Sequence, residues 1–387
     1  MPVRASPTER SGRLAAGQTL SGTARIADLE ELLGRLPAES AAAARRIYDV
    51  TTTTGRLDPP PEMTAWVERL FGSIAAVREQ SIVRVTDTVT LEGALFNELR
   101  SRRPMEVKGT DEVREAIEAS RGDPFCRPET GTPADPFGRV RGDHGVTASN
   151  IAKYDGYHGV LVFDEHDPLA PMDEATVRDH LATARRWAVA ALEQDPGARY
   201  WFLMWNSLWR AGGSIVHGHM QMTTTRGMHY PRIEALRRHA LAYGERTSHD
   251  YFEDRWAVHR DLGLGIEVGR ARLFASLTPV KEREAIVMGR PGEDESTLAA
   301  GIARVLSAYR AMGVVAHNMA LYLPPLAPDG EDRRAEEDWS AFPPTARLVD
   351  RGDPGNRTTD IGAMELYAAS VISSDPFRVA DALRTSA

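Results

Sequence analysis

The sequence contains a single cysteine, Cys126, so no disulfide bond can form within the chain. One cysteine in 387 residues is typical of a protein that works in a reducing compartment. The N-terminal residues include no apolar stretch like the core of a signal peptide, and no apolar run reaches membrane-spanning length. We therefore expect a cytoplasmic protein with no membrane partner.

Two further absences narrow the function. The sequence has no G-x-x-x-x-G-K-[ST] phosphate-binding loop, so P-loop chemistry is not expected, and we expect no nicotinamide or flavin site either. The formal net charge of -8 argues against a nucleic-acid partner, although a local basic pocket for phosphate is compatible with it. The length suffices for one large domain or two ordinary domains with a sizeable core.

The most informative stretch reads Gly-Gly-Ser-Ile-Val-His-Gly-His-Met-Gln-Met over residues 212–222. In a β-strand, side chains alternate between faces, so His217, His219 and Gln221 would form one row. Neutral imidazole is both a nucleophile and a common metal ligand. The row therefore indicates an activated histidine or a metal site. The backbone N–H groups of Gly212, Gly213 and Ser214 are expected to approach phosphate.

Helix and strand signals divide the chain. Helical spacing predicts helices over 26–48 and 63–80, and the alternation over 82–91 predicts a hairpin. The threonine run at 51–55 and a polar loop at 327–356 interrupt the pattern, and residues 1–22 are expected to be disordered. The histidines between residues 228 and 260 are expected on the surface, namely His229, His239, His249 and His259.

A pattern of strand, strand, helix and strand occurs twice after residue 149, which predicts an internal duplication. Asp173 is expected to cap the first of these helices and Ser296 the second. Only the first copy carries the His-x-His-x-Gln strand. The second copy is therefore expected to be structural or to supply an acceptor pocket.

These residues resemble the histidine-triad superfamily in its galactose-1-phosphate uridylyltransferase branch. That branch has two histidine-triad-like units in one chain, and its motif has the form of an asparagine, ten residues and H-P-H-x-Q. Here Asn206 lies eleven residues before His217, Ser214 lies three before it, and Gly218 replaces the proline. The resemblance extends over roughly residues 105–385.

The resemblance implies a role for each matching residue. His219 matches the histidine that attacks the α-phosphorus, and Gln221 matches the glutamine that binds the phosphoryl oxygens. Asn206 and Ser214 match positions that hold the phosphates and ribose. The implied reaction is a ping-pong transfer through a nucleotidyl-histidine, between a nucleotide sugar or nucleotide and a phosphorylated acceptor. Members are commonly dimers, so a homodimer is the expected assembly.

The resemblance also implies one zinc site, formed by Asp123, Cys126, His166 and His217. Asp123 stands where the family motif has a cysteine, and carboxylate oxygen is a competent zinc ligand. The sequence leaves open whether zinc binds. A second family metal site has H-x-H where this chain has Met319 and Leu321, so we expect that site to be lost.

The expected fold class is α+β, with tandem histidine-triad-like units whose antiparallel sheets are flanked by helices. The expected divisions are a mainly helical extension over 1–104, the catalytic unit over 105–227, and a degenerate second unit over 228–387. The leading activity is exchange between a nucleotide sugar and a sugar 1-phosphate. An adenylyltransferase, or a phosphorylase of dinucleotides or ADP-sugars, is the alternative, and a non-catalytic nucleotide-binding protein is the third hypothesis.

Overall fold

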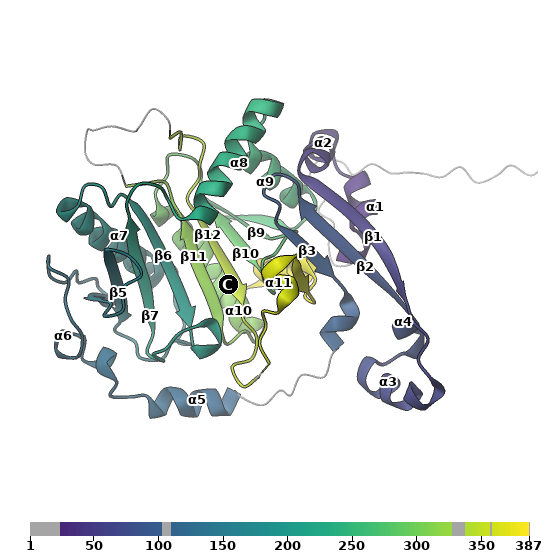
Figure 1. Cartoon of the computed structure of the whole chain (residues 1–387), viewed down its shortest axis with the longest axis horizontal. Helices are drawn as coiled ribbons and strands as arrows, with labels where there is room; N and C mark the ends of the chain where they lie inside the picture. The colour runs from purple at the N-terminus through teal and green to yellow at the C-terminus, as the bar shows by residue number, and fades with distance from the viewer. Residues whose placement is uncertain (1–23, 103–109, 327–336, 357, 387) are drawn as a thin grey trace, which may run out of the picture.

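A computed structural model describes residues 24–102, 110–326, 337–356 and 358–386 of the chain. Residues 1–22, for which the sequence predicts disorder, lie outside these ranges. The body of the molecule is a nine-stranded sheet in which every neighbouring pair is antiparallel (Figure 1). Its strands, in order across the sheet, are β4 (Gly145–Ser149), β5 (Tyr157–Phe163), β7 (His219–Thr225), β6 (Tyr200–Ser207), β11 (His317–Tyr322), β12 (Thr345–Asp350), β10 (Ala285–Met288), β9 (Ala271–Ala275) and β8 (Gly265–Val268).

The sheet consists of two similar halves. The order β4-β5-β7-β6 in one half is mirrored by β9-β10-β12-β11 in the other, and the halves meet where β6 pairs with β11. In each half one long helix connects the second strand to the third in chain order: α7 (Glu174–Gln194) in the first and α10 (Ala299–Ala311) in the second. This arrangement confirms the predicted α+β fold with tandem units.

Helices α7 and α10 cover one face of the sheet. The buried residues of α7 recur at helical spacing and include Val177, Leu181, Ala184 and Ala188, which gives the helix one apolar stripe. Asp173 caps α7 by accepting a hydrogen bond from the Thr176 amide, as predicted. The second helical segment is capped by Asp294, which accepts from the amide of Ser296.

The side chain of Gln221, on the predicted catalytic strand β7, lies on the opposite face of the sheet, away from helices α7 and α10. Cross-strand pairing places Gln221 beside Met204, Met204 beside Ala320, and Ala320 beside Arg347. Directly paired residues share a face, so these four side chains form one row across β7, β6, β11 and β12. The Arg347 side chain is 10% exposed and forms ion pairs with Glu284 and with Glu92 of the N-terminal region.

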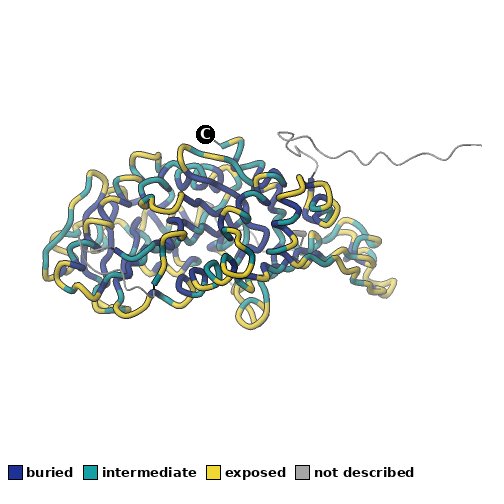
Figure 2. The backbone as a smooth tube through the Cα atoms, turned by 90° about the horizontal axis from the view of Figure 1, so that it is seen from above, coloured by how far each residue is buried: buried dark blue, intermediate teal, exposed yellow. Residues whose placement is uncertain are grey.

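The N-terminal region forms a second sheet with the end of the chain. Its four strands, in order, are β1 (Tyr48–Arg56), β2 (Glu79–Asp87), β3 (Gly93–Phe96) and β13 (Ser370–Ile372), the last parallel to β3. The distal ends of β1 and β2, with two short helices, project from the body and are mostly exposed (Figures 1 and 2). The remaining helices are α1 (Leu29–Gly34), α2 (Ala38–Ile47), α3 (Thr64–Phe71), α4 (Ile74–Arg78), α5 (Thr110–Ala119), α6 (Pro128–Gly131), α8 (Pro231–Thr247), α9 (Tyr251–Asp261), α11 (Ala363–Tyr367) and α12 (Pro376–Thr385). None of the helices in the described ranges has the length and apolarity needed to cross a membrane.

Several local expectations were wrong. The threonine run belongs to β1, because β-branched threonine suits an extended chain. The single helix expected over 63–80 is two short helices, α3 and α4, because Gly72 ends the first in a left-handed conformation, and β2 begins at Glu79. Strand β12 lies within the stretch expected to be a polar loop. His229 and His259 are buried rather than on the surface, because each lies against aromatic rings in the core.

Candidate active site and metal cluster

His219 is the first residue of β7 and is buried, with 5% of its surface exposed. Its Nδ1 lies 2.8 Å from the backbone oxygen of His217. A carbonyl oxygen only accepts, so Nδ1–H donates and the lone pair lies on Nε2. Burial lowers the pKa of His219, which keeps the ring neutral at pH 7. The ring of Phe125 packs edge-on against it at 5.1 Å.

The turn between β6 and β7 places the other predicted phosphate-binding residues. Gly213 is required, because a Cβ there would lie 2.7 Å from the oxygen of Asn206. Gly212 adopts a left-handed conformation with φ of 94°. Contrary to expectation, the amides of Gly212 and Gly213 donate to carbonyls within the turn, since a tight turn satisfies its own backbone. Ser214 follows them in an exposed position.

Asn206 is the last but one residue of β6, lies on the same face of the sheet as Gln221, and pairs directly with Asn318 of the second half. The Asn318 amide donates to Asn206 Oδ1 at 2.7 Å. The guanidinium of Arg351 donates in turn to the side-chain oxygen of Asn318. Residues of the second half therefore fix the orientation of the Asn206 amide, a contact that cannot be predicted from the motif around Asn206.

Gln221 contacts a histidine that the sequence did not single out. The Tyr154 amide donates to His158 Nδ1 at 3.1 Å, so the proton of this neutral ring lies on Nε2. His158 Nε2–H then donates to Gln221 Oε1 at 3.0 Å. With its oxygen held, the Gln221 amide presents its NH₂ group as a donor.

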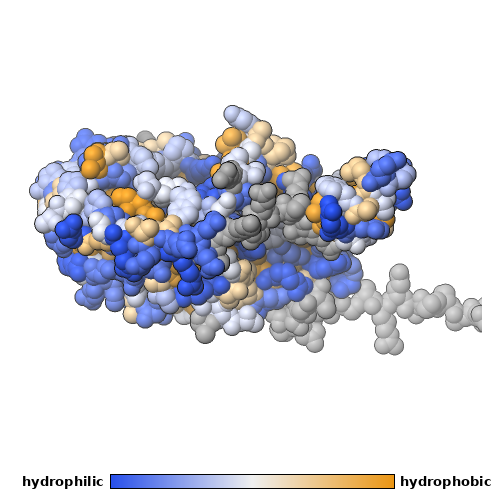
Figure 3. Space-filling model, turned by 90° about the horizontal axis from the view of Figure 1, so that it is seen from below, coloured by the Kyte–Doolittle hydropathy of each residue, from blue (hydrophilic) through white to orange (hydrophobic). Residues whose placement is uncertain are grey.

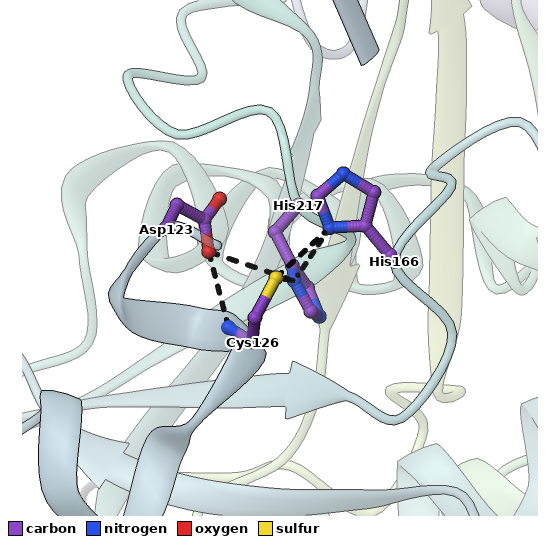
Figure 4. A group of neighbouring side chains, drawn as sticks. All are labelled: Asp123, Cys126, His166 and His217. Atoms are coloured by element: carbon purple, nitrogen blue, oxygen red, sulfur yellow. Dashed lines mark hydrogen bonds and ion pairs between the residues drawn. The ribbon is translucent and has the colours of Figure 1, made fainter. Parts of the chain in front are cut away.

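Four side chains converge at the N-terminal end of β7 (Figure 4). Asp123, Cys126, His166 and His217 each offer one ligand atom, and these atoms lie within 4.8 Å of one another. The two Nδ1 atoms of the histidines are 3.1 Å apart, and Cys126 Sγ lies 3.3 and 3.5 Å from them. The structure thus brings together all four residues of the predicted metal set.

Comparison with known proteins places this fold. No protein-family model matches the chain, and no curated protein matches it in sequence. The solved ADP-glucose phosphorylase of Arabidopsis thaliana, with bound ADP-glucose, superposes with a TM-score of 0.60 at 15% identity, covering 78% of this chain and 98% of that one. A GalT-like protein of Arabidopsis thaliana superposes with a TM-score of 0.58 at 16% identity, covering 78% of this chain and 98% of that one. A uridylyltransferase superposes with a TM-score of 0.52 at 15% identity, covering 65% of this chain and 87% of that one.

The chain has the fold of the galactose-1-phosphate uridylyltransferase branch. The resemblance inferred from the strand motif is therefore confirmed at the level of the fold.

The glycine in place of the uridylyltransferase-like proline has a local cause. A Cβ on Gly218 would lie 2.6 Å from the ring of Phe163. The backbone amide of Gly218 donates a hydrogen bond to the backbone oxygen of His166 at 3.2 Å. Proline has no N–H and its ring would meet Phe163. Gly218 therefore ties the strand to the neighbouring loop that carries His166.

The donor set of the cluster fits a zinc ion. His166 Nε2 lies 2.9 Å from the oxygen of Ile117 and His217 Nε2 lies 2.8 Å from that of Phe163, so both rings turn an unprotonated Nδ1 inward. Tetrahedral zinc separates two nitrogens by about 3.3 Å, and nitrogen from sulfur by about 3.6 Å. Asp123 Oδ1 accepts hydrogen bonds from the amides of the short helix at residues 124–126 and also lies 3.7 Å from His217 Nδ1 (Figure 4). A carboxylate oxygen has more than one lone pair, so Oδ1 can also act as the fourth ligand.

Proposed function

We propose that the chain is a nucleotidyltransferase that works through a covalent nucleotidyl-histidine at His219. The leading reaction is transfer of a nucleoside monophosphate from a nucleotide sugar to a sugar 1-phosphate. The observation that carries the proposal is the hydrogen bond from His219 Nδ1 to the His217 oxygen. It leaves Nε2 unprotonated, and Nε2 has no hydrogen-bond partner among the described residues.

The transfer consists of two displacements. His219 Nε2 attacks the α-phosphorus with its lone pair, an N–P bond forms, and the P–O bond to the leaving phosphate breaks. The positive charge that develops on the ring is stabilised by the Nδ1–H bond to the His217 oxygen. A phosphate oxygen of the acceptor then attacks the same phosphorus and the N–P bond breaks, which returns His219 to its neutral form.

Neighbouring groups supply the electrostatic stabilisation. The NH₂ group of Gln221 donates to an equatorial phosphoryl oxygen, where hydrogen bonds strengthen as charge develops. Asn206 and Ser214 hold the remaining phosphate and the ribose. A zinc ion at the Asp123 cluster would have four protein ligands and act structurally, fixing the backbone at His217. We also propose 105–227 as the unit that performs the chemistry, 228–387 as its degenerate partner, 1–104 as an extension, and a homodimer as the assembly.

A phosphorylase of ADP-sugars is the second candidate. The structure with the highest TM-score of the three compared is titled an ADP-glucose phosphorylase with bound ADP-glucose. The same histidine would carry AMP, and inorganic phosphate would replace the sugar 1-phosphate as acceptor. The chemistry at His219 is identical, so the two candidates differ only in the base and the acceptor.

Intact mass spectrometry after incubation with single donors tests the proposal. UDP-glucose, ADP-glucose and diadenosine tetraphosphate are added separately, without acceptor. The leading candidate predicts a mass increase of one uridylyl group with UDP-glucose alone, and the second predicts one adenylyl group with ADP-glucose. If no donor leaves an adduct or is turned over, the proposed transfer from these donors is rejected and the hypothesis of a non-catalytic nucleotide-binding protein is favoured.

His158 is expected to act through Gln221 as a positioning residue. His158→Phe keeps the ring but removes the hydrogen bond to Gln221 Oε1, so the amide loses its orientation. Gln221→Ala is expected to slow adduct formation roughly 100-fold, as loss of one oxyanion donor does, and His158→Phe by a smaller factor. Stopped-time mass spectrometry of both variants and the double variant measures the coupling.

The double variant distinguishes positioning from a separate role. If His158 acts only through Gln221, the double variant is no slower than Gln221→Ala alone. If the rate reduction of the double variant equals the product of the two single reductions, His158 contributes independently of Gln221.

A further inference from the structure

A pocket of about 260 Å³ lies on the helix-covered face of the large sheet, opposite the face that carries Gln221. Trp205 and His317 line it from β6 and β11, and both alternate along their strands with residues of the open face. Leu306 and Tyr309 of α10 form another wall, and Arg114 of α5 also lines the pocket. The side of the molecule at the bottom of Figure 1, where α5 lies, is largely hydrophilic with separate apolar patches (Figure 3).

The charged residues that line the pocket are all cationic. Arg114 and Arg310 are both exposed, and no carboxylate lines the pocket. Arg310 Nη2 donates to the oxygen of Leu169 at 3.2 Å, which leaves other donors of its guanidinium available. The pocket therefore combines an apolar interior with two positive groups, which suits an anion attached to an apolar body.

His317 supplies the second, independent observation. It is buried, with 6% of its surface exposed, and its Nε2 has no hydrogen-bond partner among the residues that the structure describes. Its ring packs edge-on against Trp205 at 4.6 Å. Burial lowers its pKa to about 4, so the ring is neutral at pH 7. A buried polar atom without a partner is costly unless something completes its hydrogen bond, and this residue lines the pocket.

We propose that this pocket is a second, non-catalytic binding site for a small organic carboxylate with an apolar body. The carboxylate pairs with the guanidinium groups of Arg114 and Arg310, whose planar forks match its two oxygens. The apolar body lies against Leu306 and Tyr309, and a polar atom of the ligand bonds to His317. The volume falls just below the range of about 300–1,000 Å³ typical of drug-sized ligands, so a single-ring molecule is the expected size.

Calorimetry and ligand-observed NMR on the full chain test the site. The probes are benzoate, phenylacetate and 3-phenylpropionate, each compared with its neutral amide. At least one carboxylate is expected to bind at up to millimolar concentration and more tightly than its amide. Binding is expected to persist in His219→Ala, because that residue lies on the other face. Failure of all three carboxylates to bind overturns the proposal.

Variants then locate the bound probe. Arg114→Gln is expected to weaken carboxylate binding roughly tenfold, because it removes one charge-assisted hydrogen bond, while Arg304→Gln on the same helix as Arg310 leaves binding unchanged. Leu306→Trp fills the pocket and should abolish binding. His317→Phe is expected to weaken binding and also to raise the melting temperature, because it removes the unpartnered nitrogen. Equal binding by wild type and Arg114→Gln, or by wild type and a folded Leu306→Trp, places the probe elsewhere and rejects the pocket.

Discussion

Replacing His219 with alanine is expected to abolish both the covalent adduct and turnover, with a rate loss of roughly 10⁴-fold or more. His166 and His217 also present an unprotonated nitrogen, but both face Cys126 in the metal cluster, whereas His219 lies two residues from Gln221 on β7. The measurement is intact mass of wild type and variant after equal exposure to the donor that labels wild type. The wild-type adduct should be lost in acid and survive in base, as an N–P bond requires.

His249→Ala is the matched control for this experiment. His249 is exposed on the surface, so its removal should change neither the adduct nor the melting temperature. The assignment of the nucleophile is rejected if His219→Ala still forms the adduct in undiminished yield. Equal melting temperatures for wild type and His219→Ala show that a lost adduct reflects chemistry rather than unfolding.

Replacing Asp123 with asparagine is expected to lower the affinity for zinc by roughly 100-fold. Structural zinc sites contribute about 10–16 kcal/mol, so one ligand of four accounts for about 3 kcal/mol, which corresponds to that factor. The asparagine side chain keeps an oxygen that can cap the helix at residues 124–126, but it removes the negative charge that the carboxylate offers to the metal. Competition with a chelator and elemental analysis measure the change.

Cys126→Ser and Asp123→Cys complete the metal series. Cys126→Ser should lower both the zinc content and the melting temperature. Asp123→Cys gives the loop the two cysteines of the family motif and should raise the affinity for zinc. Protein that contains no zinc and melts identically in Cys126→Ser would show that the loop holds no metal. Elemental analysis should find at most one zinc per chain. Two bound metals would contradict the expectation that the stretch around Met319 has lost its site.

The strand that carries His219 and Gln221 could be predicted because its information is local. His219 and Gln221 are two residues apart, so the alternation of a strand is enough to place them on one face. The metal set followed from the family resemblance rather than from spacing, since Cys126 and His217 are 91 residues apart. Only the folded chain brings their ligand atoms into one cluster.

Contacts between distant strands could not be predicted. His158 and Gln221 are 63 residues apart and meet across the β5–β7 pair, and nothing in either segment alone indicates the other. Strand β12 was overlooked because it follows a polar stretch and its alternation is brief. The pairing of Asn206 with Asn318 depends on the junction of the two halves, which is set by tertiary packing.

The row that begins at Gln221 ends, three strands away, at Arg347 and its ion pairs with Glu284 and Glu92. Strands lie about 4.8 Å apart, so the Cα atoms of Gln221 and Arg347 are about 14 Å apart. Glu92 belongs to the N-terminal region, so this ion pair anchors that region to the large sheet at a fixed distance, three strands away from Gln221.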